Sequence, residues 1–304
     1  MIAALFLAFA QADPNALARR AYDAATAGNH EAAIADLREA ARLAPRNALY
    51  RSALGGVHER LGKHGEAAAE FAEAARLDPS NAGFRARLEN AMLEHGAELA
   101  RARRYRAGLT LALDAAKRFP ASAPVHQMLG LFETRNQRNV SAAAAYRRAL
   151  ELNPSSGAAS VGLGIALSGA GLDKEARAAF EAGIARFQKD PAHRQAYGVF
   201  LAKSAEPGSA AAARAAEMLE SALAIDPNLA EASYQLGNLA LAQEDAVSAA
   251  AHFDAAGRNG LDDSRLHWAK ARALRRLGQT AAAEKHLELF RARKRAEETA
   301  SGQP

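Results

Sequence analysis

The residue types that carry most enzyme and metal chemistry are sparse and scattered in this 304-residue chain. It contains no cysteine, which excludes disulfides, thiolate metal sites and cysteine nucleophiles. Its nine histidines form no His-Glu-x-x-His pair and show no metal-ligand spacing with acidic support. We find no nucleophile, base and orienting partner that one fold would bring together. The sequence therefore predicts no catalytic, metal or cofactor site, and a protein that is not an enzyme.

Two glycine motifs resemble phosphate-binding loops only superficially. Gly162 and Gly164 are followed by Gly169 and Gly171, but a dinucleotide-binding loop needs a preceding strand, and the surrounding pattern is helical. Gly62-Lys63 lacks the earlier glycine and the following Ser or Thr of a P-loop. We interpret these glycines as helix-packing and turn positions.

Two basic segments, residues 101–106 and 291–295, could contact RNA or an anionic lipid. The first reads Arg-Ala-Arg-Arg-Tyr-Arg and the second Arg-Ala-Arg-Lys-Arg, while the net charge of the whole chain is only +5. Aromatic residues interleave with the arginines only at Tyr105. The simpler interpretation is solvated helix faces, the second at a helix C-terminus where cations are favoured. We therefore place nucleic-acid binding behind protein binding.

The elements that carry these residues are predicted by composition and by a recurring proline. Hydrophobic residues make up 49% of the chain but aromatic residues only 6%, so the apolar content is mostly Ala and Leu, which favours closely packed helices. Prolines recur at intervals of 34, 41, 34, 37 and 36 residues: Pro45, Pro79, Pro120, Pro154, Pro191 and Pro227. Such a period is typical of a repeat architecture.

The segment from Ala48 to Pro79 illustrates one repeat. A first helix is predicted to end near Gly62 and a second to run from about Gly65 to Leu77, because Gly favours helix ends and Pro cannot continue a helix. Leu54-Gly55 lies in the first helix, and Ala67, Phe71 and Ala74 share one face of the second.

This pattern resembles the tetratricopeptide repeat, a 34-residue helix-turn-helix with Leu-Gly, then Ala, an aromatic residue and Ala, and a closing Pro. Matching sets are Leu129-Gly130, Ala142, Tyr146, Ala149 and Pro154; Leu163-Gly164, Gly171, Ala176 and Phe180; and Leu236-Gly237, Ala249, Phe253 and Ala256. The resemblance implies an all-α, right-handed superhelical solenoid of antiparallel helix pairs. We expect eight repeats, at residues 13–47, 48–81, 82–122, 123–156, 157–190, 191–229, 230–263 and 264–290.

Four parts depart from the regular repeat. We expect a first helix two turns longer before Pro120, a second helix one turn longer before Pro191, and an enlarged turn at residues 205–209. Residues 291–304 should form a polar capping helix end that becomes disordered from Thr299. No stretch is long and apolar enough to span a bilayer.

Residues 1–12 are open to two interpretations. An apolar run ends in Ala8-Phe9-Ala10, which resembles the end of a truncated secretory signal peptide, although no basic residue precedes it. The alternative is a frayed first helix turn. We place an exported or periplasmic location slightly ahead of a cytoplasmic one.

The family resemblance also implies a groove lined by the first helices of the repeats. Its usual groove positions correspond in the last two repeats to Tyr234, Asn238, Leu241, Arg265, Trp268, Arg272, Arg275 and Arg276. Aromatic residues and arginine dominate binding energy at interfaces, and arginine pairs well with carboxylates. Trp268 either faces this groove or packs into the core of the last pair, one place past the family's core position at His267.

We therefore expect a non-enzymatic scaffold whose groove binds a segment of an acidic protein partner. The alternatives are a basic adaptor for RNA or anionic lipid, and a regulatory subunit that acts in trans with an enzyme. Ala18 and Tyr22 stand where the family's carboxylate clamp would need Lys and Asn, which argues against recognition of a chaperone tail.

Overall fold

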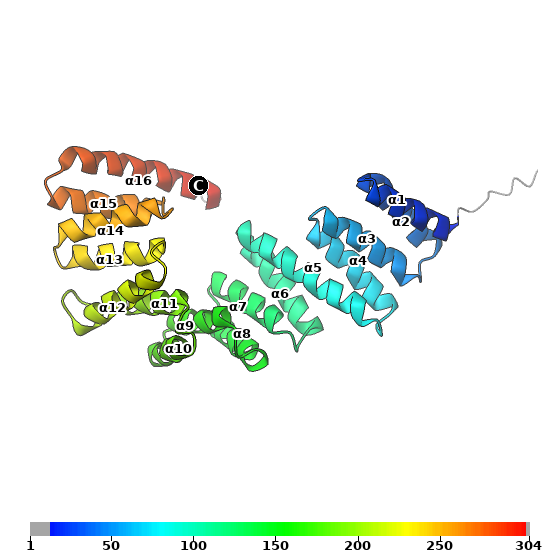
Figure 1. Ribbon diagram of the computed structural model, residues 1–304, viewed down its shortest axis with the longest axis horizontal. Helices are drawn as coiled ribbons and strands as arrows, with labels where there is room; N and C mark the ends of the chain where they lie inside the picture. The colour runs from blue at the N-terminus through cyan, green and yellow to red at the C-terminus, as the bar shows by residue number, and fades with distance from the viewer. Residues whose placement is uncertain (1–12, 302–304) are drawn as a thin grey trace, which may run out of the picture. The chain divides into compact units, whose positions relative to one another are not determined.

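A computed structural model describes residues 13–301 of the chain, and this range is all-helical, without strands. Contacts divide it into two compact units, between Asn136 and Gln137. Figure 1 labels the helices of both units. Those of the N-terminal unit are α1 (Pro14–Thr26), α2 (His30–Leu43), α3 (Ala48–Arg60), α4 (His64–Leu77), α5 (Ala82–Arg101), α6 (Tyr105–Arg118) and α7 (Ala123–Arg135). Those of the C-terminal unit are α8 (Asn139–Leu152), α9 (Gly157–Gly169), α10 (Asp173–Arg186), α11 (Pro191–Ala202), α12 (Ala210–Ile225), α13 (Ala230–Ala242), α14 (Ala246–Arg258), α15 (Ser264–Arg276) and α16 (Thr280–Ser301).

Within each unit, consecutive helices pack against each other, which confirms the all-helical repeat fold. Two helices begin in each of the eight predicted ranges, and the division between the compact units falls inside the range 123–156.

The Leu-Gly signature and the aromatic residue of the second helix interlock within a pair. A Cβ atom added to Gly55, Gly164 or Gly237 would lie 2.6, 2.4 or 2.5 Å from the Phe ring of the same repeat. These rings, Phe71, Phe180 and Phe253, are buried. A side chain larger than hydrogen would therefore displace a core aromatic ring, which explains why these two positions occur together.

The recurring prolines mark the end of a second helix in five of six cases. Pro45, Pro79, Pro120, Pro154 and Pro227 each lie two residues beyond the last residue of α2, α4, α6, α8 and α12, respectively. Pro cannot continue a helix, so this position stops each one sharply.

The longer helix predicted before Pro191 is wrong. The preceding helix, α10, has 14 residues, which is the length of α8. Pro191 is instead the first residue of α11 and follows the N-cap residue Asp190. A proline is well accepted at the first position of a helix, because its missing N–H would have no partner there. The irregular spacing therefore reflects a different role of this proline.

The other two internal departures are confirmed. Helix α5 has 20 residues, whereas α3 and α7 have 13, so its first-helix extension is two turns. The connection from α11 to α12 spans residues 203–209 and includes Gly208 in the left-handed region, with φ +72°.

The C-terminal prediction is wrong in one respect: α16 continues to Ser301, so residues 299–301 are helical. The Glu297 side chain accepts hydrogen bonds from the Ser264 backbone N–H and hydroxyl, at 2.9 and 2.7 Å. Arg293 of α16 also donates a hydrogen bond to Asp262, just before α15, with Nε 3.2 Å from Oδ1. These contacts hold the polar end of α16 against the start of α15. The predicted signal-peptide segment, residues 1–12, lies outside the described residues.

Candidate functional site

The first helices of successive pairs form a continuous surface in the C-terminal unit. Helix α9 contacts α11, α11 contacts α13, and α13 contacts α15. We call this surface the first-helix face. It is the surface on which the predicted groove residues of the last two repeats were placed.

An apolar pocket of 280 Å³ opens on this face between α9, α11 and α13. Ile165, Val199 and Phe200 line it, with Lys203 and Gln235 at its polar side. Ile165 is 46% exposed, so it presents apolar surface to solvent at this pocket. The volume is slightly below the roughly 300–1,000 Å³ of small-molecule sites. It is therefore better suited to one or two side chains of a partner segment.

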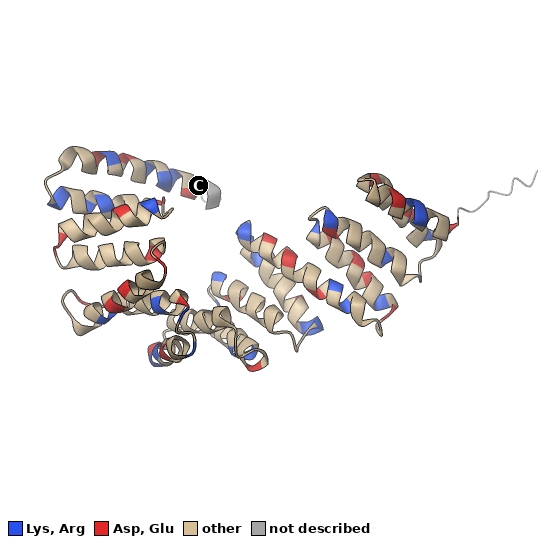
Figure 2. Ribbon diagram, viewed as in Figure 1, with Lys and Arg blue, Asp and Glu red and all other residues tan. Residues whose placement is uncertain are grey.

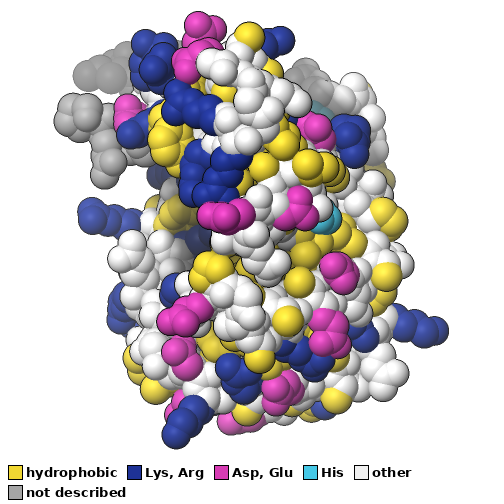
Figure 3. Space-filling view, turned by 90° about the vertical axis from the view of Figure 1, so that its left-hand side faces the viewer, with side chains coloured by type: hydrophobic (Ala, Val, Ile, Leu, Met, Phe, Trp, Pro, Cys, Tyr) yellow, Lys and Arg dark blue, Asp and Glu magenta, His cyan; other side chains and the backbone are white. Residues whose placement is uncertain are grey.

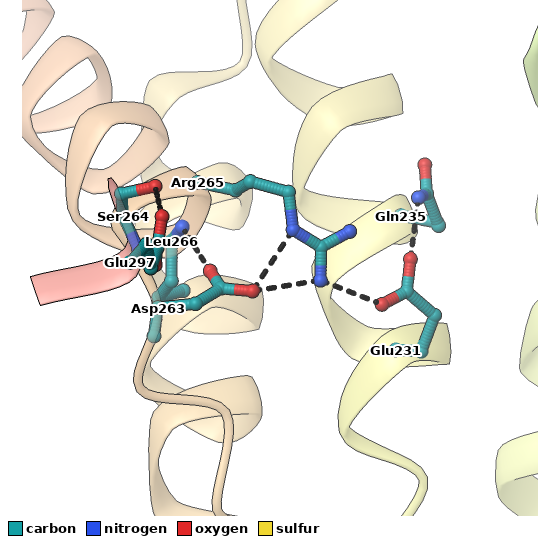
Figure 4. Close-up of polar contacts among 7 residues, drawn as sticks. All are labelled: Glu231, Gln235, Asp263, Ser264, Arg265, Leu266 and Glu297. Atoms are coloured by element: carbon teal, nitrogen blue, oxygen red, sulfur yellow. Dashed lines mark hydrogen bonds and ion pairs between the residues drawn. The ribbon is translucent and has the colours of Figure 1, made fainter. Parts of the chain in front are cut away.

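A chain of polar contacts continues from this pocket to α15 (Figure 4). The Gln235 amide donates to Glu231 at 2.8 Å, and the other Glu231 oxygen faces the Arg265 guanidinium at 3.4 Å. Arg265 also pairs with Asp263 at 2.8 Å. Burial lowers the pKa of Arg265, but the bond to Asp263 and the charge of Glu231 outweigh it, and the pKa is raised. Arg265 therefore stays charged and links α13 to α15.

Two aromatic residues flank this bridge. The Arg265 guanidinium lies 5.2 Å above the ring of Tyr234, which packs 5.9 Å from Phe253. Trp268 is 45% exposed, and its ring lies 5.3 Å from that of Phe290 on α16. Trp268 thus presents nearly half of its large apolar side chain to solvent.

The neighbouring core position holds His267, as the family register implies. His267 is buried, with Nε2 2.9 Å from Asp262 Oδ1 and Nδ1 3.1 Å from His286 Nδ1. Burial, followed by the charges of Lys270 and His267, lowers the pKa of His286. A neutral His286 can donate its Nδ1 proton to His267, which in turn donates to Asp262.

The predicted arginines are less available than the sequence suggests. Arg275 pairs with Glu284 at 2.9 Å, and Arg276 donates to the Leu241 carbonyl at 2.5 Å. In the part of the chain described, Arg272 is exposed and has no ion pair or side-chain hydrogen bond. Figure 3 shows the same intermixing of charge, with acidic side chains beside the Lys and Arg side chains in the upper half of that view.

One predicted groove residue is wrong. Leu241 is 2% exposed, because it packs in the core with Ala249, Phe253 and Leu266. Asn238, in contrast, is half-buried one turn along α13 from Tyr234.

Comparison with known proteins identifies the family. Tetratricopeptide repeat models match residues 18–82, 93–157 and 134–198, which together are more than half of the chain. The chain is a tetratricopeptide repeat protein. No curated protein matches its sequence.

Solved structures show the same fold at low identity. A tetratricopeptide repeat protein from Parabacteroides merdae is 19% identical over 86% of this chain and 98% of its own, with a TM-score of 0.56. A chain of the APC/C hetero-tetramer Cut9–Hcn1 is 16% identical over 94% of this chain and 54% of its own, with a TM-score of 0.61. PilF of Pseudomonas aeruginosa is 17% identical over 68% of this chain and 93% of its own, with a TM-score of 0.56. At these identities the likeness concerns the fold alone.

Tetratricopeptide repeats generally mediate protein–protein interaction. The family's usual groove positions, applied to more repeats, would also have predicted the residues of the pocket. Ile165 and Val199 occupy the ninth position of their repeats, as Asn238 and Arg272 do in the last two. Applying these positions to repeats 157–190 and 191–229 would have marked both. Glu231, at the second position of its repeat like Arg265, would also have been marked, whereas Phe290 on the second helix α16 carries no such signal.

Two classes of feature are missing from residues 13–301 of this repeat protein. Within that range, no group of three His, Asp or Glu side chains is arranged to hold a metal ion. No helix there is both long and apolar enough to cross a membrane.

Proposed function

We propose that this protein is a non-enzymatic scaffold that holds an extended segment of a partner protein along the first-helix face of its C-terminal unit. The observation that carries the proposal is the apolar pocket at Ile165, linked through Gln235 and Glu231 to Arg265 and the aromatic residues of the last pairs. Exposed apolar surface bordered by polar groups is typical of interaction sites. Tetratricopeptide repeats generally bind proteins, which supports this choice over a catalytic role.

The chemistry of the face indicates what the segment should contain. An aliphatic or aromatic side chain would fill the pocket between α9 and α11, and Trp268 would cover a second apolar side chain. Arg272 is available for a carboxylate, whereas Arg265 and Arg275 already have carboxylate partners. We therefore propose a partner segment with apolar anchors and a single acidic position, which is a narrower requirement than general acidity.

Peptide display on the purified protein tests this proposal. The affinity of a selected peptide would be measured for wild type, Ile165→Glu and Val247→Glu. Both residues are exposed aliphatics, 46% and 68%, but Val247 lies on the second helix α14. We expect Ile165→Glu to weaken binding at least about tenfold, since a charge would enter the apolar pocket, and Val247→Glu to leave it within about twofold.

The sole tryptophan provides an independent signal. Trp268 should become less accessible to acrylamide when the peptide binds. Selected peptides that tolerate Ile165→Glu and leave Trp268 quenching unchanged would mean that the partner binds elsewhere.

A further inference from the structure

The turn between α5 and α6 concentrates positive charge that nothing in the described structure neutralises. Arg101, Arg103, Arg104 and Arg106 are all exposed, and none makes an ion pair or side-chain hydrogen bond within residues 13–301. Figure 2 shows Lys and Arg at this end of α5. The nearest carboxylate along α5, Glu98, is already engaged.

Glu98 faces two histidines instead of the arginines. Its Oε2 lies 3.3 Å from His95 Nδ1 and its Oε1 3.8 Å from His64 Nε2. Many other arginines do have carboxylate partners one turn away on their own helix, for example Arg42 with Glu39 and Arg76 with Glu73, both at 2.6 Å. The lack of partners at this turn is therefore a local property.

The turn holds a residue with a Cβ at a left-handed position, as the turns at Gln137 and Glu244 also do. Arg103 has φ +54°, in the left-handed region. Glycine occupies the equivalent position in four other turns: Gly28, Gly62, Gly171 and Gly278. A left-handed conformation disfavours any residue with a Cβ, so arginine here costs stability.

Two further arginines lie at the start of α6. Arg104 is the N-cap of α6 and makes no side-chain capping hydrogen bond, like Lys63 of α4 and Leu172 of α10. Arg106 lies in the first turn of α6, where the helix dipole disfavours a cation. Arginine therefore stands at two positions, 103 and 106, where local preference disfavours it, and such exceptions concentrate at functional sites.

A fifth arginine extends the cluster. Arg135 at the end of α7 lies 5.8 Å from the Tyr105 ring, and Asn136 donates to the Tyr105 carbonyl at 3.0 Å. These contacts place the end of α7 beside the start of α6. We name the five arginines 101, 103, 104, 106 and 135 the arginine turn.

We propose that the arginine turn docks this protein on an anionic phospholipid surface. Guanidinium groups bind phosphate by charge-assisted hydrogen bonds, and clustered arginines are attracted to anionic bilayers. Proteins that bind single-stranded nucleic acid typically add exposed aromatic rings on which its bases stack. The only ring in this turn, Tyr105, is half-buried and covered by Arg135, and the exposed large hydrophobics of the described chain include none from residues 101–106. The contact should therefore be peripheral and electrostatic.

Vesicle sedimentation with the full chain tests this inference. Vesicles of phosphatidylglycerol and phosphatidylcholine would be compared with phosphatidylcholine alone, for wild type and two double variants. Arg103→Gly/Arg106→Gln removes two charges from the arginine turn. Arg291→Gln/Arg295→Gln removes two charges from exposed positions of α16 and is the matched control.

The expected results distinguish vesicle binding by the arginine turn from binding by any basic surface of the protein. Each arginine near an anionic surface contributes about fivefold to partitioning, so the first variant should lose about 25-fold and the control less than about threefold. Binding should fall steeply between low and physiological salt. Circular dichroism melting shows whether both variants remain folded.

Three outcomes would overturn the inference. The wild type could fail to bind anionic vesicles at low salt, both variants could lose binding equally, or a single-stranded RNA oligonucleotide could bind more tightly than the vesicles. The last result would assign the arginine turn to nucleic acid.

Discussion

The two arginine-rich regions of this protein differ in what their guanidinium groups already contact. In α15 and α16, Arg265, Arg275 and Arg293 pair with Glu231 and Asp263, with Glu284, and with Asp262, respectively. In the arginine turn, residues 101–106 hold four arginines without such partners in the described structure. The difference concerns these paired arginines, because Arg272, Arg291 and Arg295 are exposed and also lack ion pairs in the described range. The paired arginines position helices, and the unpaired ones remain available to an external anion.

The largest expected change in the free energy of unfolding comes from Asp262, which contacts both His267 and Arg293. Asp262→Ala removes the acceptor of the buried His267, whose Nε2 lies 2.9 Å away, and of Arg293. A buried polar group without its partner costs about 1–3 kcal/mol. We expect the free energy of unfolding to fall by that amount in urea denaturation. Glu288→Ala, an exposed change on α16 without such contacts, is the control, and an equal effect would contradict the assigned role of Asp262.

A substitution in the arginine turn should raise the free energy of unfolding instead of lowering it. Arg103→Gly relieves a left-handed residue with a Cβ and should raise the free energy of unfolding by about 1 kcal/mol. The reverse change at an equivalent turn, Gly62→Arg, should lower it by a similar amount. If Arg103→Gly destabilised the protein, this arginine would have a structural role, and the contrast between the two regions would fail.

Acidification should destabilise the packing of α15 against α16. Burial, with Lys270 and His267 nearby, lowers the pKa of His286 below its unfolded value, while Asp254 opposes this. As the pH falls, His286 is therefore protonated in the unfolded state before it is protonated in the folded state. The stability that the neutral, buried His286 contributes is present above about pH 6.5 and is lost as the pH falls through the lowered pKa of the folded state.

Hydrogen exchange measures this pH effect directly. Amides of α15 and α16, corrected for intrinsic rates, should lose more protection between pH 7.5 and 5.5 in wild type than in His286→Gln. Equal losses in the two proteins would exclude His286 as the source.

The smallest effect is expected for an exposed ion pair. Arg275 and Glu284 are each about half exposed, with side-chain exposures of 52%. Such pairs contribute about 0–1 kcal/mol. Arg275→Ala should therefore change the free energy of unfolding by less than about 1 kcal/mol. A much larger loss would mean that this exposed pair stabilises the helices more strongly than solvent screening allows.

Local patterns predicted the fold because its units are local. Leu54-Gly55 and Phe71 interlock within one repeat, and the two-turn extension of α5 follows from helical phase. The prediction at Pro191 was wrong because proline is accepted both just beyond a helix and at the first position of one. The candidate site was only partly predictable. Arg265 and Glu231 lie 34 positions apart, which is one repeat period, whereas the contacts of Trp268 with Phe290 and of Arg275 with Glu284 follow no such spacing.

Site-specific photo-crosslinking in cells tests the central claim most directly. A benzophenone amino acid would replace Ile165 on the first-helix face or, as a control, Val247 on α14. We predict a discrete crosslinked partner from position 165, absent from position 247 and reduced by Trp268→Ala/Arg272→Ala. The account would be contradicted if position 165 gave no adduct, or if position 247 gave the same one.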